Sequence, residues 1–343
     1  MKTSSIASDN VQNQNDSSNA IELILNYEKN RYVNKGYGLI SAILICFSWF
    51  FIIPQTAKYW WPKEIEKEGK FYSIACYATH EFWFIVCNFT MWIIYKLENP
   101  FFERYKIHDK EWPWKRNLNE WRKTIKETIL LIFVNQVIFL PLVLLPNYLK
   151  NESISRVDYE TLPGPYEVII QTLFFMIVED TSFYWIHRFF HMDFIYPYIH
   201  KIHHKYVNTV SISSEYAHPI EYIFGNLFPT SLGALILGKR VHLFTYLMWI
   251  VLRIAETTDG HCGYEFSWSP FRLMPMSGGS DYHNYHHLAF KGNYGSFFTY
   301  WDRICNTVHH RYLQFIEKKR EIYKKIELEE AKNKKLEMEK KSQ

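Results

Sequence analysis

The sequence has few cysteines, and they are not spaced as ligands or as bridges. Its 5 cysteines are an odd number and include no Cys-x-x-Cys pair, so neither a disulfide framework nor a thiolate zinc site is expected. It has no glycine-rich phosphate loop and no basic face, and its formal net charge is only +4, which argues against a nucleic-acid partner. The charged residues are also not spread evenly along the chain. The 22% of charged residues cluster in blocks between long apolar runs, which is typical of a polytopic membrane protein.

The apolar runs predict membrane-spanning helices. Four runs approach the roughly 20 residues that a spanning helix needs, and they cover 36–54, 71–95, 128–146 and 166–186. A later stretch, 222–254, consists of two shorter halves broken at Gly238. It predicts a short hairpin or a segment that dips into the bilayer and returns. The expected fold class is therefore all-α: a polytopic membrane bundle of about four spanning helices plus this membrane hairpin.

Positive charge predicts the orientation. The block 96–126 holds 9 Lys or Arg, whereas the opposite loops hold 4 in 55–70 and 2 in 147–165. Because cytosolic loops carry the excess of Lys and Arg, we expect the N-terminus, this block and everything after 186 to face the cytosol.

Most of the 15 histidines lie between positions 187 and 287, in three motifs. The first is His-x-x-x-His, and the second and third are both His-x-x-His-His. The motif residues are His187 and His191; His200, His203 and His204; and His283, His286 and His287. Residues three and four apart share a helix face, so each motif should point its imidazoles the same way. Eight clustered imidazoles exceed what one ion can bind, which implies at least two metal ions.

The ligand set and the location narrow the chemistry. Zinc hydrolases usually keep three protein ligands, and structural zinc favours cysteine. Iron with open positions for dioxygen is the redox alternative, and the neighbouring bilayer favours an apolar substrate. Asp180 lies seven residues before His187. It is expected either to orient a liganding imidazole or to make a structural polar contact with a neighbouring helix.

At this point the chain resembles the sterol desaturase/fatty acid hydroxylase superfamily of membrane non-haem diiron enzymes, and within it the C-4 methylsterol oxidases. The resemblance covers roughly 166–307. Its motifs are Glu179-Asp180, the three histidine motifs, Ala217-His218-Pro219 with Glu221, His261 with Gly263-Tyr264, and Gly292-Asn293-Tyr294-Gly295 leading to Trp301-Asp302-Arg303.

The resemblance implies two iron ions in a cytosolic, histidine-rich helical cap. The ligands that it implies are His187, His191, His200, His203, His204, His261, His283, His286 and His287, with His218 and Asp180 less directly indicated. It also implies activation of O2 with electrons from NAD(P)H through cytochrome b5 or a similar carrier and its reductase. Because no His-Pro-Gly-Gly segment occurs, the carrier would be a separate protein. In the family a sterol C-4 methyl group is oxidised stepwise to alcohol, aldehyde and carboxylate.

Three departures leave the substrate open. Thr257 stands where related hydroxylases carry a histidine, Asn284 where many methylsterol oxidases carry an acid, and Asp281-Tyr282 where a basic residue and a histidine are common. A sterol desaturase, a sterol side-chain dealkylase and a fatty acid or alkane hydroxylase stay as alternatives. A zinc-binding membrane transporter or sensor is the alternative of a different class.

The expected organisation has four parts. A polar, disordered lead-in covers 1–35, three spans with their loops cover 36–165, a catalytic domain of the fatty acid hydroxylase type covers 166–310, and a charged helical tail covers 311–343. The last four residues, 340–343, begin with Lys340-Lys341 and resemble a dilysine retrieval signal. With both termini in the cytosol, they predict a multi-pass protein of the endoplasmic reticulum membrane.

Overall fold

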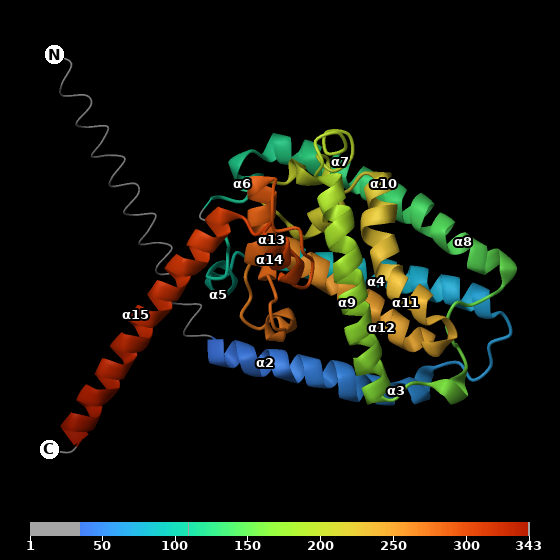
Figure 1. Ribbon diagram of the computed structural model, residues 1–343, viewed down its shortest axis with the longest axis horizontal. Coiled ribbons are helices and arrows are strands. Elements are labelled where there is room, and N and C mark those ends of the chain that lie inside the picture. The colour runs from blue at the N-terminus through green and yellow to red at the C-terminus, as the bar shows by residue number, and fades with distance from the viewer. Residues whose placement is uncertain (1–34, 109, 342–343) are drawn as a thin grey trace, which may run out of the picture.

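The computed structural model describes residues 35–108 and 110–341. The expected polar lead-in falls almost entirely outside these ranges, as do the last two residues of the expected retrieval signal. Within the described ranges every regular element is a helix (Figure 1), which confirms the predicted all-α class.

The longer helices form the body of the molecule. They are α2 (Lys35–Phe47), α3 (Ile53–Trp60), α4 (Glu68–Leu97), α7 (Leu118–Val134), α8 (Leu140–Lys150), α9 (Pro165–Phe190), α11 (Phe228–Leu237), α12 (Leu243–His261), α13 (Gly279–Ala289) and α15 (His310–Lys341). Shorter helices are α5 (Pro100–Glu103), α6 (Pro113–Arg116), α10 (Pro219–Glu221) and α14 (Tyr300–Ile304).

Single π-helical and 3₁₀ turns complete the chain. The π-helical turns η1 (Ser48–Ile52), η2 (Asn135–Phe139) and η6 (Tyr222–Leu227) join α2 to α3, α7 to α8 and α10 to α11. Each such set therefore runs on as one long helix. The 3₁₀ turns are η3 (Tyr159–Thr161), η4 (His203–Lys205), η5 (Ser211–Glu215), η7 (Gly238–Arg240) and η8 (Pro270–Leu273).

Among the described residues, three helices are long and apolar enough to cross a membrane: Gly36–Trp60, Leu118–Lys150 and Pro219–Arg240. The first two contain the spans expected at 36–54 and 128–146. The third lies in the first half of the expected hairpin. The chain is a membrane protein, and its hairpin breaks where it was expected to, at Gly238. The φ of 53° at this residue is a conformation that glycine adopts without a steric penalty.

The runs 71–95 and 166–186, which were also expected to be spans, form the helices α4 and α9, and neither is among these three helices. In α9, Glu179 and Asp180 are 1% and 0% exposed, whereas Ile170, Leu173 and Ile177 are more than half exposed. These three residues repeat at the spacing of one helix face. The outer face of α9 is thus apolar, as a helix in a bilayer requires. The buried polar residues of its inner face lower the mean hydropathy of the helix.

The helices pack around α12, which lies against α4, while α4 also packs on α8 and α9 packs on α11. Phe175, Tyr246 and Trp249 belong to the main buried core. Inside the bundle, the Arg253 guanidinium donates to the Glu179 carboxylate over 2.8 Å and so ties α12 to α9.

Two contacts set the position of the histidine-bearing end. Figure 1 shows α9 with α13 and α14 on one side and α11 on the other, while α15 runs away from the body. The Trp301 indole N–H of α14 donates to the Thr181 hydroxyl of α9 over 3.1 Å. The Tyr95 hydroxyl of α4 donates over 2.7 Å to the carbonyl of Cys262, the residue after α12. The ends of α4, α9, α12 and α14 are thereby fixed around one site.

Candidate metal centre

The structure brings all nine predicted histidines together in two groups. The five-histidine group consists of His187, His191, His200, His204 and His286, and the four-histidine group consists of His203, His261, His283 and His287. In each group the possible ligand atoms lie within 4.8 Å of one another. Two clusters of nitrogen atoms fit the expectation that one ion would not be enough.

The two His-x-x-His-His motifs do not each serve one group, which departs from the expectation that a motif points all its imidazoles one way. In both motifs, the first and last histidines share a group and the middle one belongs to the other. Each residue of a helix turns the chain by about 100°. Residues four apart in α13 therefore differ by only about 40°, whereas the adjacent residues His286 and His287 diverge by about 100°. His203 and His204 lie in the 3₁₀ turn η4, where adjacent residues diverge by about 120°. Each motif thus contributes to both groups.

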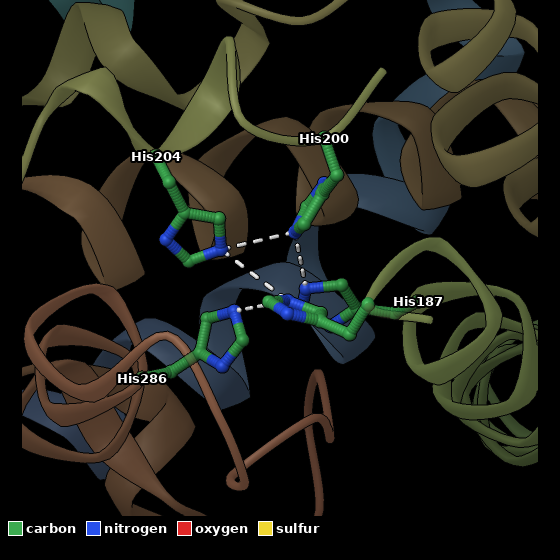
Figure 2. Close-up of side chains that lie close together, drawn as sticks. His187, His200, His204 and His286 are labelled. Carbon is green, nitrogen blue, oxygen red and sulfur yellow. Dashed lines mark hydrogen bonds between the residues drawn. The ribbon is translucent and has the colours of Figure 1, made fainter. Parts of the chain in front are cut away.

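Four separate segments position the nine side chains. His187 lies in the last turn of α9 and His191 is its C-cap residue. His200, His203 and His204 lie in the turns that end in η4, while His261 is the last residue of α12. The remaining three lie on α13. Figure 2 shows side chains of the five-histidine group from three of these segments converging.

The imidazoles of the five-histidine group face one another through Nε2 atoms. The Nε2 atom of His200 lies 3.1 Å from that of His187 and 3.0 Å from that of His204. The Nε2 atom of His191 lies 3.3 Å from that of His204 and 3.2 Å from that of His286. Two nitrogen ligands about 2.1 Å from one metal ion lie about 3.0–3.4 Å apart. The spacing therefore fits a shared ion.

The four-histidine group has the same spacing. The Nε2 atom of His261 lies 2.9 Å from that of His283 and 3.3 Å from that of His203, and the Nε2 atoms of His283 and His287 are 3.1 Å apart. By the same argument from distances between Nε2 atoms, the spacing in this group fits a second metal ion.

Hydrogen bonds at the opposite ring nitrogen hold five of these rings. The Nδ1 partners are the Tyr294 carbonyl for His187 (2.9 Å), the Gly292 carbonyl for His286 (2.7 Å), the Glu221 carboxylate for His200 (2.7 Å), the Tyr216 carbonyl for His203 (3.2 Å) and the Thr257 carbonyl for His261 (2.8 Å). Each partner is an acceptor, so each Nδ1 carries the proton and donates it. The Nε2 lone pair is then directed into the group, as metal-ligating histidines require.

Electrostatics also keep these rings neutral. Burial lowers the pKa of His203 to about 4. Burial, together with the neighbouring imidazoles of His187 and His203, lowers the pKa of His191 to about 2. Both values lie far below the usual 6.5 of histidine. Neutral imidazole is the form that binds a metal ion.

Two further expected residues lie outside both groups. The Asp180 carboxylate accepts from the backbone N–H of Phe298 over 2.9 Å and so contacts a neighbouring loop, as in the structural alternative. The ring of His218 accepts from the backbone N–H of Ile220 over 3.2 Å and caps α10. The structure thus gives both residues backbone-supporting contacts.

The sequence motif from Gly292 to Asp302 takes part in the site through its backbone, which residue types alone did not indicate. Gly292 and Asn293 have φ values of 78° and 57°, and a Cβ atom at Gly292 would lie 2.5 Å from the Thr307 carbonyl. The Asp302 carboxylate accepts from the backbone N–H groups of Tyr294 and Gly295 over 3.0 and 2.7 Å. This tight loop supplies the two carbonyls that hold His187 and His286.

Glu221 is the second functional residue that the sequence did not assign. Its carboxylate orients His200, and the one available signal was its place in the segment His218-Pro219-Ile220-Glu221. A helical turn that starts at Pro219 brings the side chain of Glu221 back toward the second histidine motif.

A cavity opens beside both groups. It is lined by His187 and His200 of the five-histidine group, by His203, His261 and His283 of the four-histidine group, and by Phe183, Phe190, Phe271 and Phe297. Glu256 lines it too, and burial raises the pKa of this carboxyl to about 7, although the Arg253 guanidinium opposes the shift. The site therefore combines nitrogen ligands, an apolar wall and one acid that can hold a proton near neutral pH.

Comparison with known proteins finds a family model and named relatives. Residues 172–307 match the model described as fatty acid hydroxylase. A very-long-chain aldehyde decarbonylase of Oryza sativa is 43% identical over 152 residues, which are 43% of this chain and 56% of the relative. The chain thus spans little more than half of that protein.

Two other relatives carry sterol names. The C-4 methylsterol oxidase of Schizosaccharomyces pombe is 35% identical over 241 residues, 68% of this chain and 76% of the relative. A putative methylsterol monooxygenase of Dictyostelium discoideum is 37% identical over 224 residues, 64% of this chain and 79% of the relative. No solved structure matches the chain.

Proposed function

The chain belongs to the fatty acid hydroxylase family, and on that premise we propose that it is an O2-dependent membrane oxidase acting on the C-4 methyl group of sterols. The product of the stepwise oxidation would be the carboxylate, reached through the alcohol and the aldehyde. The observation that carries the proposal is the pair of histidine groups, which face one cavity with an aromatic wall.

The donor set fits two iron ions, one in each group, with His187, His191, His200, His204 and His286 holding the first and His203, His261, His283 and His287 the second. When bound, iron with nitrogen ligands and open positions supplies the reduction of O2 that C–H oxidation needs. The chain's contribution is to fix the ligands. The Nδ1 hydrogen bonds to backbone carbonyls and to Glu221 hold the rings before any ion arrives.

The surrounding residues would serve the reaction in two ways. Phe183, Phe190 and Phe271 limit the access of water to the cavity, which favours an apolar substrate. The Glu256 carboxyl, whose pKa burial raises to about 7, can bind a proton beside the metal site and donate it during the reaction. Asp180 and His218 are proposed to act only through the backbone that they support.

The electrons would come from NAD(P)H through a separate carrier, cytochrome b5 or a similar protein with its reductase. Delivery of these electrons by such a carrier fits a metal site on the cytosolic side. The N- and C-termini would lie on that same side, and the protein would reside in the endoplasmic reticulum membrane. In this arrangement residues 36–165 anchor the chain, 166–310 form the catalytic domain and 311–343 form the tail.

The sterol substrate is supported by the methylsterol names of the Schizosaccharomyces and Dictyostelium relatives. The test is incubation of microsomes that contain the protein with NADPH, O2 and a 4,4-dimethylsterol. We expect a 4-carboxysterol product and about two irons per chain. Stoichiometric zinc without iron in protein expressed at its native level would favour the transporter or sensor instead.

A second candidate follows from the relatives named aldehyde decarbonylase. It is an oxidase of long-chain aldehydes or fatty acyl chains with the same metal site. The same microsomes are therefore incubated with a long-chain aldehyde. Turnover of that aldehyde, with the 4,4-dimethylsterol untouched, would keep the oxidase class and overturn the sterol substrate.

A further inference from the structure

A second cavity lies inside the helix bundle, next to the metal-side cavity. It is lined mostly by apolar side chains of α8, η6 and α12, among them Leu140, Val143, Leu144, Leu227, Ile250 and Ile254. Residues of α8 and of η6 with α11 belong to two of the helices that are apolar enough to cross a membrane. The cavity is therefore bordered by two helices that can lie in a bilayer, from which an apolar ligand can enter without crossing water.

The two cavities adjoin each other. Four residues line both of them: Ser214, Asn226, Arg253 and Thr257. A ligand whose apolar body fills the bundle cavity thus has one end next to the histidine groups. This junction is the place where an oxidised carbon would have to lie.

Two hydroxyl groups on the wall of the bundle cavity have no partner. The Ser214 and Tyr222 hydroxyls are buried and make no hydrogen bond to the described residues, and the two side chains are 4% and 0% exposed. Burying a hydroxyl without a hydrogen-bond partner is unfavourable. A ligand hydroxyl at this place would remove that cost.

The charged groups beside these hydroxyls already have partners. The Glu215 carboxylate contacts His80 over 3.1 Å and accepts from the Gln136 side chain over 2.7 Å. His80 also contacts Glu81 over 3.1 Å. This network fixes Glu215, and through the chain its neighbour Ser214, but it leaves the Ser214 and Tyr222 hydroxyls available.

We propose that the bundle cavity binds the apolar body of the substrate and that Ser214 and Tyr222 bind a hydroxyl group on it. The inference rests on the proposed function and specifies its substrate as a hydroxylated polycyclic lipid. In a 4-methylsterol, the carbon that bears the 3-hydroxyl is bonded to the carbon that bears the methyl group. A hydroxyl held at Ser214, which lines both cavities, therefore directs the C-4 methyl group toward the histidines. The hydroxyl can donate to one protein oxygen while it accepts from the other.

The test is equilibrium binding without turnover. The full chain is purified, placed in lipid nanodiscs and kept without reductant. The probes are a tritiated 4,4-dimethylsterol and its 3-deoxy analogue. The wild-type protein should bind the 3-hydroxy sterol about five- to thirtyfold more tightly, which corresponds to one or two neutral hydrogen bonds. Tyr222→Phe and Ser214→Ala should each lower this preference about three- to tenfold while leaving the affinity for the 3-deoxy analogue nearly unchanged.

Tyr246→Phe is the matched control, because Tyr246 lines the same cavity but its hydroxyl already donates to the Ser231 hydroxyl over 3.2 Å. It should keep the wild-type preference. The proposal is overturned if the preference is absent in the wild type, if it survives in both Tyr222→Phe and Ser214→Ala, or if Tyr246→Phe lowers it equally.

Sterol turnover is measured separately and tells the two proposals apart. A wild-type protein that prefers the 3-hydroxy probe but oxidises no sterol would retain the hydroxyl site and refute the proposed function. A protein that forms the 4-carboxysterol while the two variants keep the full preference would retain the proposed function and refute the hydroxyl site.

Discussion

The two histidine groups have similar ligand spacing but differ in enclosure and in support. Two of the five rings in the first group line the metal-side cavity, compared with three of the four in the second. The first group has a carboxylate partner, Glu221 on His200, whereas in the second group the Nδ1 partners of His203 and His261 are backbone carbonyls. A carboxylate partner makes an imidazole a stronger ligand. We therefore expect the five-histidine group to hold a metal ion more tightly and the four-histidine group to leave more room for a ligand from outside the protein.

The largest effect should come from removing one ligand of each group. His286→Ala and His203→Ala should each lower sterol turnover more than about 100-fold, beyond the usual cost of losing an outer partner. Each protein should stay in the membrane and lose about one metal equivalent. Metal analysis and the microsomal assay measure the two effects. His310→Ala changes an exposed histidine and should match the wild type. Turnover retained in either ligand variant would refute the assignment of that group.

Partial removal of the metal tests directly whether the two histidine groups differ in how tightly they hold a metal ion. A chelator should strip the more open four-histidine group first, so activity should fall to background while about half of the metal remains bound. The measurement is turnover plotted against the metal retained by the purified protein. Activity that falls in proportion to the total metal would show that the groups retain metal equally well.

The local spacing predicted eight of the candidate ligands and the family resemblance added His261, and the structure brings all nine together. Their division into two groups was not predictable from spacing alone. It depends on the turn of about 120° between His203 and His204 in η4 and on how α13 docks against the end of α9. The hydrogen-bond partners of the imidazole rings were not predictable from the sequence for a different reason. The carbonyl that holds His187 belongs to Tyr294, which lies far along the chain, and no backbone carbonyl has a signature in residue type.

The helical class was predictable because apolar runs of sufficient length leave few other folds in a bilayer. The assignment of individual spans was less direct. In α9, buried Glu179 and Asp180 lower the hydropathy of a helix whose outer face is apolar. Only the packing against Arg253 and the 296–299 loop shows that these acids face inward.

Removing the charge of Glu221 should have the next largest effect. Glu221→Gln keeps the shape of the side chain but no longer offers a carboxylate to the Nδ1 atom of His200. Losses of an outer partner typically cost 10- to 100-fold in metal affinity or activity. We expect a loss in this range, with the metal lost from the five-histidine group. The readout is metal retained during dialysis against a weak chelator.

Glu167→Gln is the matched control, because Glu167 is a partly exposed acid at the start of α9 that pairs with Arg156 and lies outside both groups. If Glu221→Gln retains metal as well as Glu167→Gln does, then the carboxylate does not distinguish the two groups.

Asp180 should affect the five-histidine group more weakly, through the loop that it holds. Asp180→Ala would leave the buried N–H of Phe298 without its acceptor, at a cost of roughly 1–3 kcal/mol in the free energy of unfolding. The loop also carries the Gly292 and Tyr294 carbonyls, so turnover should fall several-fold. Asp180→Asn keeps an acceptor oxygen and should restore most of the stability. A loss of turnover as large as that of His286→Ala would instead indicate a direct role at the metal.

The smallest effect is expected at His218. Its ring accepts from the Ile220 N–H and caps α10, the helical turn that also carries Glu221. Losing a cap costs about 0.5–2 kcal/mol, and α10 is one short turn of a longer helix, so the lower end applies. His218→Ala should therefore bind the full complement of metal and keep most of its turnover. His218→Asn, which keeps a capping acceptor, should match the wild type in thermal stability. Loss of one metal equivalent in His218→Ala that His218→Asn does not restore would make His218 a tenth ligand.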